Sequence, residues 1–414
     1  MKKRDFIKTM ALGGLAIPLS GMSQTIETNM NFNFDGDWDK MRKAYRLSDA
    51  YINLENGYYN IAPTDILEHQ IHQLKQLNLT GSHYMRTTMS SQREATRLSM
   101  AQFLQVPVEE LIITRNTTES LDTIISGYPW QKGDEAIMAR QEYGSMLDMF
   151  KQQARRFGMV NTLLDIPLHP VSDEEIVDLY RKAITPRTKM ILVSHMINIT
   201  GHILPIRKIC DMAHEHGVKV LVDGAHAIAH FVFKISDLNC DYYGASLHKW
   251  LSVPLGAGIL YVKKENISEI WPLFGEAAYA DTDIRKLNHT GTMPLHIENS
   301  IPFAIQFYNS IGGERKEARL RYLQRYWSDK LRGRKGIIIN TPEAPERSCG
   351  IANIGLEGMT PAKLAETLMK DHKIWTVAID NAGVKGCRIT PNVYTTINEL
   401  DQFIKAIETI QKNN

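Results

Sequence analysis

The amino-acid sequence predicts an α/β protein, with a large domain built on a mostly parallel sheet and a smaller C-terminal α/β domain. Between about residues 65 and 265, short apolar runs alternate with amphipathic stretches, which is the pattern of strands and helices in α/β units. Residues Lys335–Asn414 follow a strand–helix–strand–helix rhythm of their own. The chain has 414 residues, of which 43% are hydrophobic and 23% are charged, so it can bury sizeable cores.

The N-terminal residues MKKRDFIKTMALGGLAIPLSGMSQ have the layout of an export signal, because a cationic start precedes an apolar stretch and small residues. The segment Lys3–Lys8 resembles a twin-arginine signal with Lys in the first arginine place, although the general secretory route accepts a similar layout. The apolar stretch Met10–Leu19 is shorter than the ~20 residues that span a bilayer. We therefore expect residues 1–24 to be an export signal and the mature chain to be periplasmic, without membrane attachment. A retained amphipathic N-terminal helix and a cytoplasmic chain are the alternative.

Charge and cysteine usage exclude several classes of protein. The 48 basic and 46 acidic residues give a net charge of +2, without the basic surplus of a nucleic-acid-binding protein. Four cysteines without a CxxC pair do not make a disulfide framework. The 14 histidines contain no HExxH pattern, and His226 and His230, four residues apart, are better explained without a metal. We therefore expect neither a nucleic-acid partner nor a metal site.

The apolar runs of the large domain are predicted as strands, and they end near Thr114, Met138, Val193, Val222 and Val262. The polar clusters that follow four of these runs are Asn116–Thr118, Glu142–Tyr143, Ser194–Asn198 and Asp223–His226. Sheets of this kind bind ligands beyond the carboxyl ends of their strands. The clusters are therefore expected to form one site from distant segments.

Two helical stretches and one domain boundary follow from the same patterns. Residues Ile203–His216 have helical spacing and are followed by Gly217, which predicts the end of a helix. Residues Pro294–Trp327 are predicted as one long helical stretch that leads into the C-terminal part. We expect residues 25–310 to hold an N-terminal segment and the large domain, and residues 311–414 to form the small domain.

The segment 220–262, VLVDGAHAIAHFVFKISDLNCDYYGASLHKWLSVPLGAGILYV, resembles the class V aminotransferase family of pyridoxal-phosphate (PLP)-dependent enzymes. The resemblance runs over most of residues 45–410, and the family includes cysteine desulfurases, kynureninase and isopenicillin N epimerase-like proteins. Tyr143 and the stretch SHMINITGHILP are most similar to the isopenicillin N epimerase-like branch. The resemblance implies the fold of a fold type I PLP-dependent transferase, with pyridoxal 5'-phosphate as cofactor.

The resemblance implies that Lys249 forms the Schiff base with the cofactor aldehyde and that Asp223 pairs with the pyridine nitrogen. A carboxylate at that place keeps the nitrogen protonated, so that the ring can accept electrons from the carbon beside the amino group. Lys249 is also the general base for that carbon. Taken singly, the two residues could be a surface lysine and a helix-capping aspartate, and it is their spacing and context that favour the catalytic roles.

The resemblance implies that the cofactor phosphate is bound by the side chains of Ser246 and His248 and by the turn Asn116–Thr118 at a helix N-terminus. Asn116 stands where the family has Gly, and Asn tolerates a left-handed backbone. An ordinary helix N-cap is the alternative explanation of this turn. Thr292 resembles the residue that reaches the phosphate of the partner subunit, which implies a homodimer.

The remaining cofactor and substrate contacts are also implied by the resemblance. Tyr143 stacks on the cofactor ring, and His226 and Asn198 lie near its phenolic oxygen. Arg388 clamps the α-carboxylate of a small-molecule amino-acid substrate, unless it forms a structural ion pair. Asn392 stands where the family often has His, which weakens the substrate assignment.

A desulfurase needs a nucleophilic cysteine on the loop before Arg388, near Asp380–Asn381, and no cysteine stands there. The sequence therefore favours an isopenicillin N epimerase-like epimerisation or transamination at Cα of an amino acid or an amino-acid-containing substrate. A cysteine desulfurase or a kynureninase-like lyase is the alternative, with Cys387 beside Arg388 and Cys349 further upstream. A non-catalytic PLP-binding protein is a third hypothesis. It is disfavoured because the two catalytic residues, Lys249 and Asp223, are both present.

Overall fold

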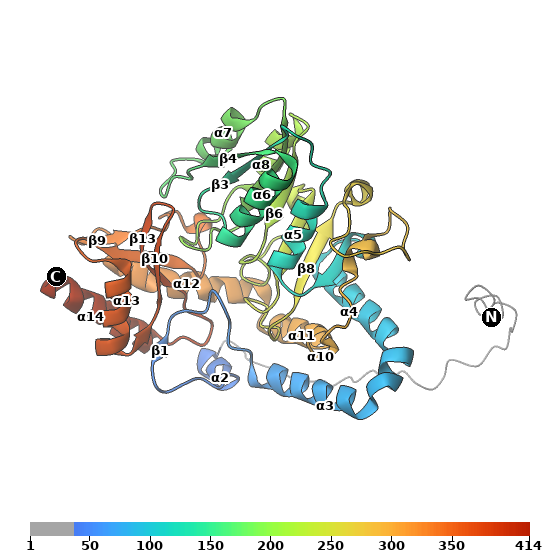
Figure 1. The fold of residues 1–414 in the computed structure, drawn as a ribbon. Helices are drawn as coiled ribbons and strands as arrows, with labels where there is room; N and C mark the ends of the chain where they lie inside the picture. The colour runs from blue at the N-terminus through green and yellow to red at the C-terminus, as the bar shows by residue number, and fades with distance from the viewer. Residues whose placement is uncertain (1–36) are drawn as a thin grey trace, which may run out of the picture. The chain divides into compact units, whose positions relative to one another are not determined.

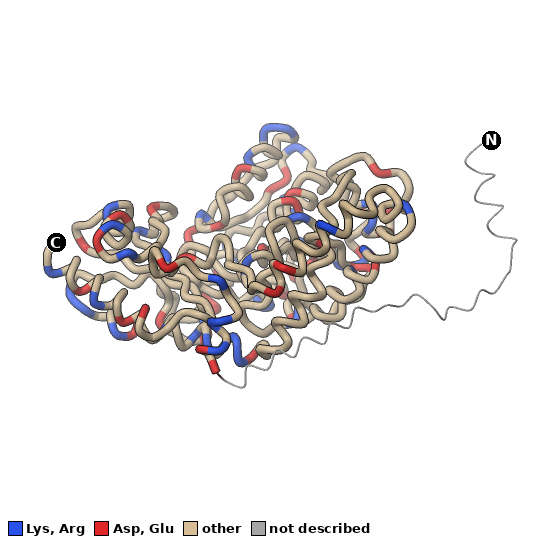
Figure 2. Tube along the Cα trace, turned by 90° about the horizontal axis from the view of Figure 1, so that it is seen from below, with Lys and Arg blue, Asp and Glu red and all other residues tan. Residues whose placement is uncertain are grey.

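The computed structural model describes residues 37–414, drawn in colour in Figure 1. The predicted export signal, residues 1–24, lies outside the described residues, so export stays a prediction. Within residues 37–414, no helix combines the length and the hydropathy that a membrane span requires. Acidic and basic positions are interspersed along this part of the chain (Figure 2), as the near-zero net charge leads one to expect.

A seven-stranded sheet forms the centre of the large domain, in the order β2-β8-β7-β6-β5-β3-β4. The strands are β2 (Leu111–Thr114), β3 (Glu135–Ala139), β4 (Val160–Leu164), β5 (Thr188–Ser194), β6 (Lys219–Asp223), β7 (Tyr242–Ser246) and β8 (Gly258–Val262). Strand β8 runs antiparallel to β2 and β7, and the pairs along β7-β6-β5-β3-β4 are parallel. The predicted α/β class with a mostly parallel sheet is confirmed.

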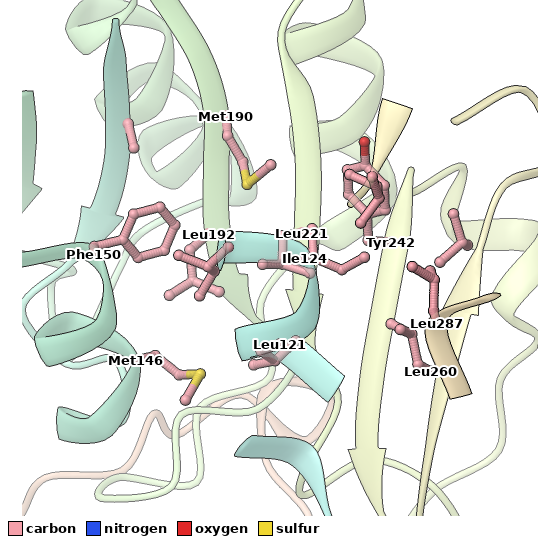
Figure 3. Packing of buried hydrophobic residues seen from close by; sticks show 14 of the residues in the cluster. Leu121, Ile124, Met146, Phe150, Met190, Leu192, Leu221, Tyr242, Leu260 and Leu287 are labelled. Atoms are coloured by element: carbon pink, nitrogen blue, oxygen red, sulfur yellow. The ribbon is translucent and has the colours of Figure 1, made fainter. Parts of the chain in front are cut away.

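Helices α5 (Thr117–Gly127) and α6 (Gly144–Phe157) cover one face of this sheet (Figures 1 and 3). Ile124 of α5 and Phe150 of α6 pack with Leu192 and Leu221 of the sheet, and all four side chains are fully buried. Burying one such side chain stabilises the fold by about 1.5–3 kcal/mol. This packing holds the first turns of α5 and α6 close to the carboxyl ends of the strands.

The helices α7 (Asp173–Ala183) and α8 (Ile206–His214) pack against each other. The stretch predicted to be helical from Ile203 begins its helix only at Ile206, because Ile203 is held in a β-bridge with Met196 and Pro205 precedes the first turn. The chain turns at Gly217, which has a φ of +69°. That conformation favours glycine, so the predicted helix end near Gly217 is confirmed.

The prediction of one long helix over Pro294–Trp327 is wrong. The structure has three helices there, α10 (Leu295–Glu298), α11 (Ile301–Ile311) and α12 (Gly313–Leu331). Gly312 separates the last two with a φ of +84°, a conformation outside the helical region. The adjacent Gly312 and Gly313 mark this break in the sequence, and no apolar residue stands between Ile311 and Ala318.

The C-terminal part has its own four-stranded antiparallel sheet, in the order β12-β13-β10-β9. Its strands are β9 (Ile337–Ile339), β10 (Ala352–Leu356), β12 (Val377–Asn381) and β13 (Val384–Ile389), and its helices are α13 (Pro361–His372) and α14 (Ile397–Asn413). Trp327 of α12 and Phe403 of α14 pack edge to face, with ring centroids 5.3 Å apart, in a core separate from that of the large sheet. This is the smaller α/β unit.

Part of the N-terminal segment joins this second core. Strand β1 (Ile52–Asn53) pairs in parallel with β11 (Ile374–Trp375), and Leu54 is fully buried in the C-terminal core. Residues 52–54, which we expected within the unit 25–310, therefore pack with the C-terminal strands. All described residues belong to one compact unit. This pairing carries the next residue, Glu55, to the end of β13.

The other described elements connect these units. They are α2 (Trp38–Lys43), α3 (Thr64–Thr87), α4 (Met89–Leu104), α9 (Ile235–Leu238), η1 (Val108–Glu110), η2 (Lys264–Glu269), η3 (Ile284–Asn288) and η4 (Pro345–Arg347). Helix α3 changes direction at Gly81, whose φ is +46°.

Candidate active site

A cavity of about 300 Å³ lies at the carboxyl ends of the central strands. The ends of β5, β6 and β7 meet there because Ser194 is in register with Asp223, and Asp223 with Gly244. The predicted site residues that line this cavity are Asn116, Thr117, Thr118, Tyr143, Asn198, Asp223, His226, Ser246, His248 and Lys249. The strand-end clusters thus come together, as the sequence predicts.

Lys249 follows β7 in the chain and is one of the residues that line the cavity. Its Nζ atom is 3.0 Å from Nε2 of His226. Burial lowers the pKa of Lys249 to about 8, and the nearby Asp223 carboxylate opposes this shift. A lysine with this pKa is partly neutral near pH 8, and the neutral amine is the form that attacks an aldehyde.

His226 supports the neutral amine of Lys249. Its Nδ1 atom lies 3.4 Å from Nε1 of Trp250, and an indole N–H can only donate. Nδ1 is therefore the acceptor, and the ring proton is on Nε2, facing Lys249. Burial lowers the pKa of His226 far below its usual value, so the ring is neutral. An Nε2–H donor beside Nζ favours the amine over the ammonium, in the same direction as burial.

Asp223 is the last residue of β6, and only 5% of its surface is exposed. Its Oδ1 atom accepts the backbone N–H of Ala225 at 2.9 Å, which fixes the carboxylate at the start of the following turn. Burial raises the pKa of Asp223, while Lys249 lowers it. A buried carboxylate that can pair with a cation is the group that a protonated pyridine nitrogen requires.

The predicted phosphate residues also come together, at the N-terminus of α5. The Oγ atom of Ser246 accepts the backbone N–H of Thr117 at 2.9 Å and lies 2.7 Å from the Thr117 hydroxyl. The hydroxyls, together with the positive end of an 11-residue helix, suit a dianion.

Asn116 does not adopt the left-handed backbone that its place in the family pattern suggested. Its φ is −174°, which is an extended conformation, and its side-chain Oδ1 caps α5 by accepting the N–H of Glu119 at 2.9 Å. The close approach here is provided by Gly258, because a Cβ on Gly258 would come within 2.7 Å of Asn116 Cα. Asn116 is thus both an N-cap and part of the cavity wall.

His248 carries the observation that best tests whether the cofactor fits. Its Nδ1 atom is buried and has no hydrogen-bond partner among residues 37–414. Burial lowers the pKa of His248 to about 4, so the ring is neutral and keeps one N–H. Buried polar atoms nearly always have a partner, and a phosphate beside Ser246 would provide one. The donor set, the buried lysine and the buried carboxylate fit PLP.

Several wall residues were not predicted as site residues. Tyr58 and Tyr59 line the cavity after β1, with ring centroids 4.4 Å apart, and a pair of adjacent aromatic residues after Gly57 is the signal that points to them. Tyr143 is the N-cap residue of α6 and is 38% exposed, as an aromatic face open to a ligand requires. Ser194, Met196 and Ala225 of the predicted strand-end clusters also line the wall, and the other unpredicted wall residues are Arg115, Met146, Leu255 and Gly256.

Glu142 lies behind the wall and is buried beside Ser194. Its Oε1 accepts the backbone N–H of Ser194 at 3.1 Å, and its Oε2 contacts the Ser194 hydroxyl. Burial raises the pKa of Glu142 to about 8, and the charge of Asp223 adds to the effect. The Glu142 carboxyl group is therefore protonated at neutral pH.

Two predicted residues do not line the cavity. Thr292 is exposed on the loop before α10, so a contact with a partner subunit stays a prediction. Arg388, on β13, is 4% exposed and holds Glu55 in a bidentate ion pair, with Nε–Oε2 at 3.0 Å and Nη2–Oε1 at 2.6 Å. The structural ion pair that we weighed against the substrate clamp is thus present.

The remaining chemical alternatives find little support. All four cysteines, Cys210, Cys240, Cys349 and Cys387, are buried. Both ring nitrogens of His230 are used by the backbone, since its Nε2 atom accepts the N–H of Gly350 at 2.8 Å and its Nδ1 atom lies 2.7 Å from the carbonyl oxygen of His226. Within residues 37–414, no group of three or more His, Cys, Asp or Glu side chains is arranged to hold a metal ion.

Comparisons with known proteins agree with this geometry. The isopenicillin N epimerase of Streptomyces clavuligerus is 26% identical over 391 residues, which cover 90% of this chain and 98% of that protein. A probable cysteine desulfurase of Vibrio cholerae is 27% identical over 384 residues, covering 86% of this chain and 92% of that protein. These two relatives bear the names of different enzymes, so overall similarity alone does not choose between the two reactions.

Solved structures share the fold. A C-DES variant with glycine covalently linked to its PLP cofactor has a TM-score of 0.80 at 20% identity, covering 88% of this chain and 98% of that chain. The cysteine desulfurase CsdA of Escherichia coli has a TM-score of 0.78 at 24% identity, covering 91% and 98%. The sequence model of the family Aminotransferase class-V matches residues 61–403, which are most of the chain. The protein therefore belongs to the class V aminotransferase family of PLP-dependent enzymes.

Proposed function

We propose that this enzyme removes a proton from, and returns it to, the carbon atom that bears the amino group of its substrate, in an isopenicillin N epimerase-like epimerisation or a transamination. The observation that carries the proposal is the Lys249 amine, buried beside the Nε2–H of neutral His226 and with a pKa lowered to about 8. A base whose pKa lies close to the working pH is efficient at proton transfer.

PLP, when bound, supplies an electron sink for negative charge on the carbon next to the amino nitrogen. Asp223 would hold the proton on the pyridine nitrogen, and Nε2–H of His226 would donate to the phenolic oxygen. Ser246, Thr117 and the N-terminus of α5 would hold the phosphate. The task of Lys249 is then to accept the proton from carbon at Nζ and to give one back.

The stereochemical result depends on which face of the carbon receives the returned proton. Return to the opposite face gives epimerisation, whereas return to the cofactor carbon gives transamination. Tyr58, Tyr59 and Tyr143 line the cavity, and each phenol can relay or shield a proton. The proposal therefore covers both outcomes and predicts hydrogen exchange at the carbon in either case.

Cysteine desulfuration is the runner-up, because several relatives bear that name. It needs an accessible thiolate near the substrate. Cys387 lies inside β13, is 0% exposed and points its Sγ at the carbonyl of Pro361, 3.6 Å away. Burial raises the pKa of Cys387 to about 12 and that of Cys349 to about 12. Neither thiol has the properties of a persulfide carrier.

The test is hydrogen exchange in deuterated water. The purified, PLP-loaded protein is incubated with a panel of amino acids and amino-acid derivatives, and deuterium at the amino-bearing carbon is followed by NMR. An accepted compound should exchange this hydrogen, and chiral analysis then separates a racemised product from a keto product. Formation of alanine from cysteine, with sulfide released by an added thiol reductant and both products abolished in Cys387→Ser, would instead establish a desulfurase.

Two further expectations belong to this proposal. Thr292 would contact the phosphate site of a second copy, and its exposed loop leaves it available for such a contact. Light scattering of the purified protein should therefore give the mass of a dimer, and a monomer with full PLP occupancy would refute this arrangement.

Export of a folded, cofactor-loaded chain by a twin-arginine-like route is tested by cell fractionation, and an uncleaved chain found only in the cytoplasm would refute it.

A further inference from the structure

The turn that follows Lys249 is strained and is held by contacts from outside it. Ser252 is buried and has a φ of +62°, a left-handed conformation that is costly for a residue with a side chain. The side-chain amide of Asn60 donates to the Ser252 hydroxyl at 2.6 Å, and this bond fixes the far end of the turn. The backbone that carries Lys249 therefore depends on partners in other segments.

Lys316 of α12 holds the near end of the same turn. Its Nζ atom donates to the backbone carbonyl of Trp250, the residue directly after Lys249. Only 4% of the Lys316 surface is exposed. Burial lowers the pKa of Lys316 to about 7, and among residues 37–414 no carboxylate opposes this shift.

A buried amine without a carboxylate partner is an unfavourable way to fill space. An ammonium in such a place destabilises the fold, and an apolar side chain of similar length would occupy the same volume at a lower cost. Stability therefore does not explain the amine of Lys316. Its hydrogen bond to the Trp250 carbonyl does, because that bond acts on the peptide next to Lys249.

Trp250 links this bond to the catalytic pair. Its indole N–H donates to Nδ1 of His226 at 3.4 Å, and its ring stacks on that of His230, with centroids 3.6 Å apart and planes at 16°. His226 in turn faces Lys249, with 3.0 Å between Nε2 and Nζ. A shift of the Trp250 backbone would therefore alter the bond that orients His226.

The rings of His230 and Trp250 are enclosed on the other side by Gly350. The Nε2 atom of His230 accepts the N–H of Gly350 at 2.8 Å, and its Nδ1 atom lies 2.7 Å from the carbonyl oxygen of His226. A Cβ at Gly350 would come within 2.9 Å of His230 Nε2 and 3.2 Å of the Trp250 ring. The indole is thus fixed by this packing, and Lys316 fixes the backbone from which it extends.

We infer that Lys316 is a positioning residue for Lys249. By holding the Trp250 carbonyl, it keeps the indole on Nδ1 of His226 and so keeps the Nε2–H of His226 directed at the lysine and at the cofactor oxygen. Lys316 does not itself line the cavity. The inference rests on one part of the proposed function, the donation from Nε2–H of His226 to the phenolic oxygen of PLP.

The test is a pH titration of the visible absorbance of the PLP-loaded protein, which reports the loss of the proton from the cofactor-bound lysine nitrogen. Lys316→Met keeps the length of the side chain and removes its N–H donors. With the His226 donor displaced, the phenolic oxygen accepts more strongly from the protonated lysine nitrogen. The midpoint of the titration should therefore rise by about half a pH unit or more, and the rate of hydrogen exchange should fall by about tenfold.

Lys286→Met is the matched control. Lys286 is 5% exposed and burial lowers its pKa too, but it lies on η3 and does not line the cavity. This variant should keep the midpoint of wild type. An unchanged midpoint in Lys316→Met, or an equal rise in both variants, would overturn the inference.

A double-mutant cycle tests the route through Trp250. Trp250→Phe keeps an aromatic ring beside His230 but removes the indole N–H, and it should raise the midpoint on its own. Adding Lys316→Met should then raise it no further, whereas additive shifts would overturn the inference. If Lys316→Met does not fold, Trp250→Phe carries the test, and an unchanged midpoint in that variant would overturn the inference.

Failure of the proposed function has a different signature, because the titration requires only lysine-bound cofactor. If no compound exchanges hydrogen, while Lys316→Met raises the midpoint and Lys286→Met does not, the proton transfer fails and the role of Lys316 stands. If exchange occurs and the midpoint is the same in wild type and Lys316→Met, the proton transfer stands and the role of Lys316 fails.

Discussion

The Nζ atom of Lys249 lies 3.0 Å from Nε2 of His226, on the side of the imidazole that carries the proton. The contact with Trp250 at 3.4 Å selects this tautomer, because the indole can only donate to Nδ1. One hydrogen bond on the far side of the ring thus decides which group faces the lysine. The same Nε2–H is available to an oxygen of the cofactor once Lys249 is engaged.

Replacing His226 should weaken catalysis more than cofactor binding. His226→Asn removes the oriented Nε2–H donor, and loss of one preorganised donor lowers kcat by about 10²-fold in comparable sites. PLP affinity, which depends mostly on the phosphate groups and Lys249, should change much less. The measurements are the rate of hydrogen exchange and fluorescence titration with PLP. A variant that loses PLP but keeps its rate per bound cofactor would contradict this role.

Asp223→Asn should separate cofactor attachment from catalysis. The variant keeps the shape of the side chain and the bond to Ala225 N–H but lacks the charge that holds a proton on the pyridine nitrogen. We expect the visible absorbance of the lysine-bound cofactor to persist and the exchange rate to fall by about a hundredfold or more. A rate within tenfold of wild type would show that Asp223 is not the partner of the ring nitrogen.

Glu142 predicts a specific dependence of stability on pH. Burial raises its pKa from 4.5 to about 8 in the folded protein, so between these values the folded state holds a proton that the unfolded chain releases. The contribution of Glu142 to the free energy of unfolding is therefore fully present below pH 4.5. It is lost as the pH rises toward 8, by up to about 1.4 kcal/mol per pH unit.

Glu142→Gln, which mimics the protonated acid, should remove this loss. The difference in free energy of unfolding between variant and wild type should grow as the pH rises from 5 to about 8, as measured by urea unfolding. Glu135→Gln serves as the control, because hydrogen bonds from Thr185 and Arg187 lower the pKa of Glu135 instead. A difference that does not vary with pH would mean that Glu142 is ionised in the folded protein.

Replacing Cys387 should leave the chemistry intact. Cys387→Ala removes a buried sulfur from β13 and should cost about 1–2 kcal/mol of stability through the small cavity that it leaves. The hydrogen exchange rate should stay within about twofold of wild type, since the thiol reaches neither the cavity nor Lys249. Loss of activity in a variant that folds and binds PLP would reopen the desulfurase alternative.

The sequence predicts most of the site because its residues stand next to strand ends. Asp223 and Ser246 end buried β-strands, so their position at one edge of the sheet follows from the α/β pattern. The predicted roles of Asn116 illustrate the limit. Its extended backbone depends on how closely Gly258 approaches from a neighbouring strand, and a linear pattern does not contain that contact.

The pairing of Glu55 with Arg388 was beyond the reach of the sequence for a similar reason. The two residues are 333 positions apart and come together only because β1 pairs with β11 beside the C-terminal sheet. The short β1 carries little periodicity, so neither the strand nor its partner is visible in the pattern. The break at Gly312 is different, because the pair Gly312–Gly313 marks it in the sequence and the prediction of one helix does not take that pair into account.

Absorbance of Lys249→Ala tests the central claim most directly. The variant and wild type are purified with excess PLP, desalted, and compared by their visible spectra before and after reduction with borohydride, with mass spectrometry of the reduced proteins. The account predicts that wild type carries the cofactor covalently at Lys249, and that Lys249→Ala folds but carries no covalent cofactor and exchanges no hydrogen. An unchanged visible band and a reduced cofactor adduct in Lys249→Ala would contradict it.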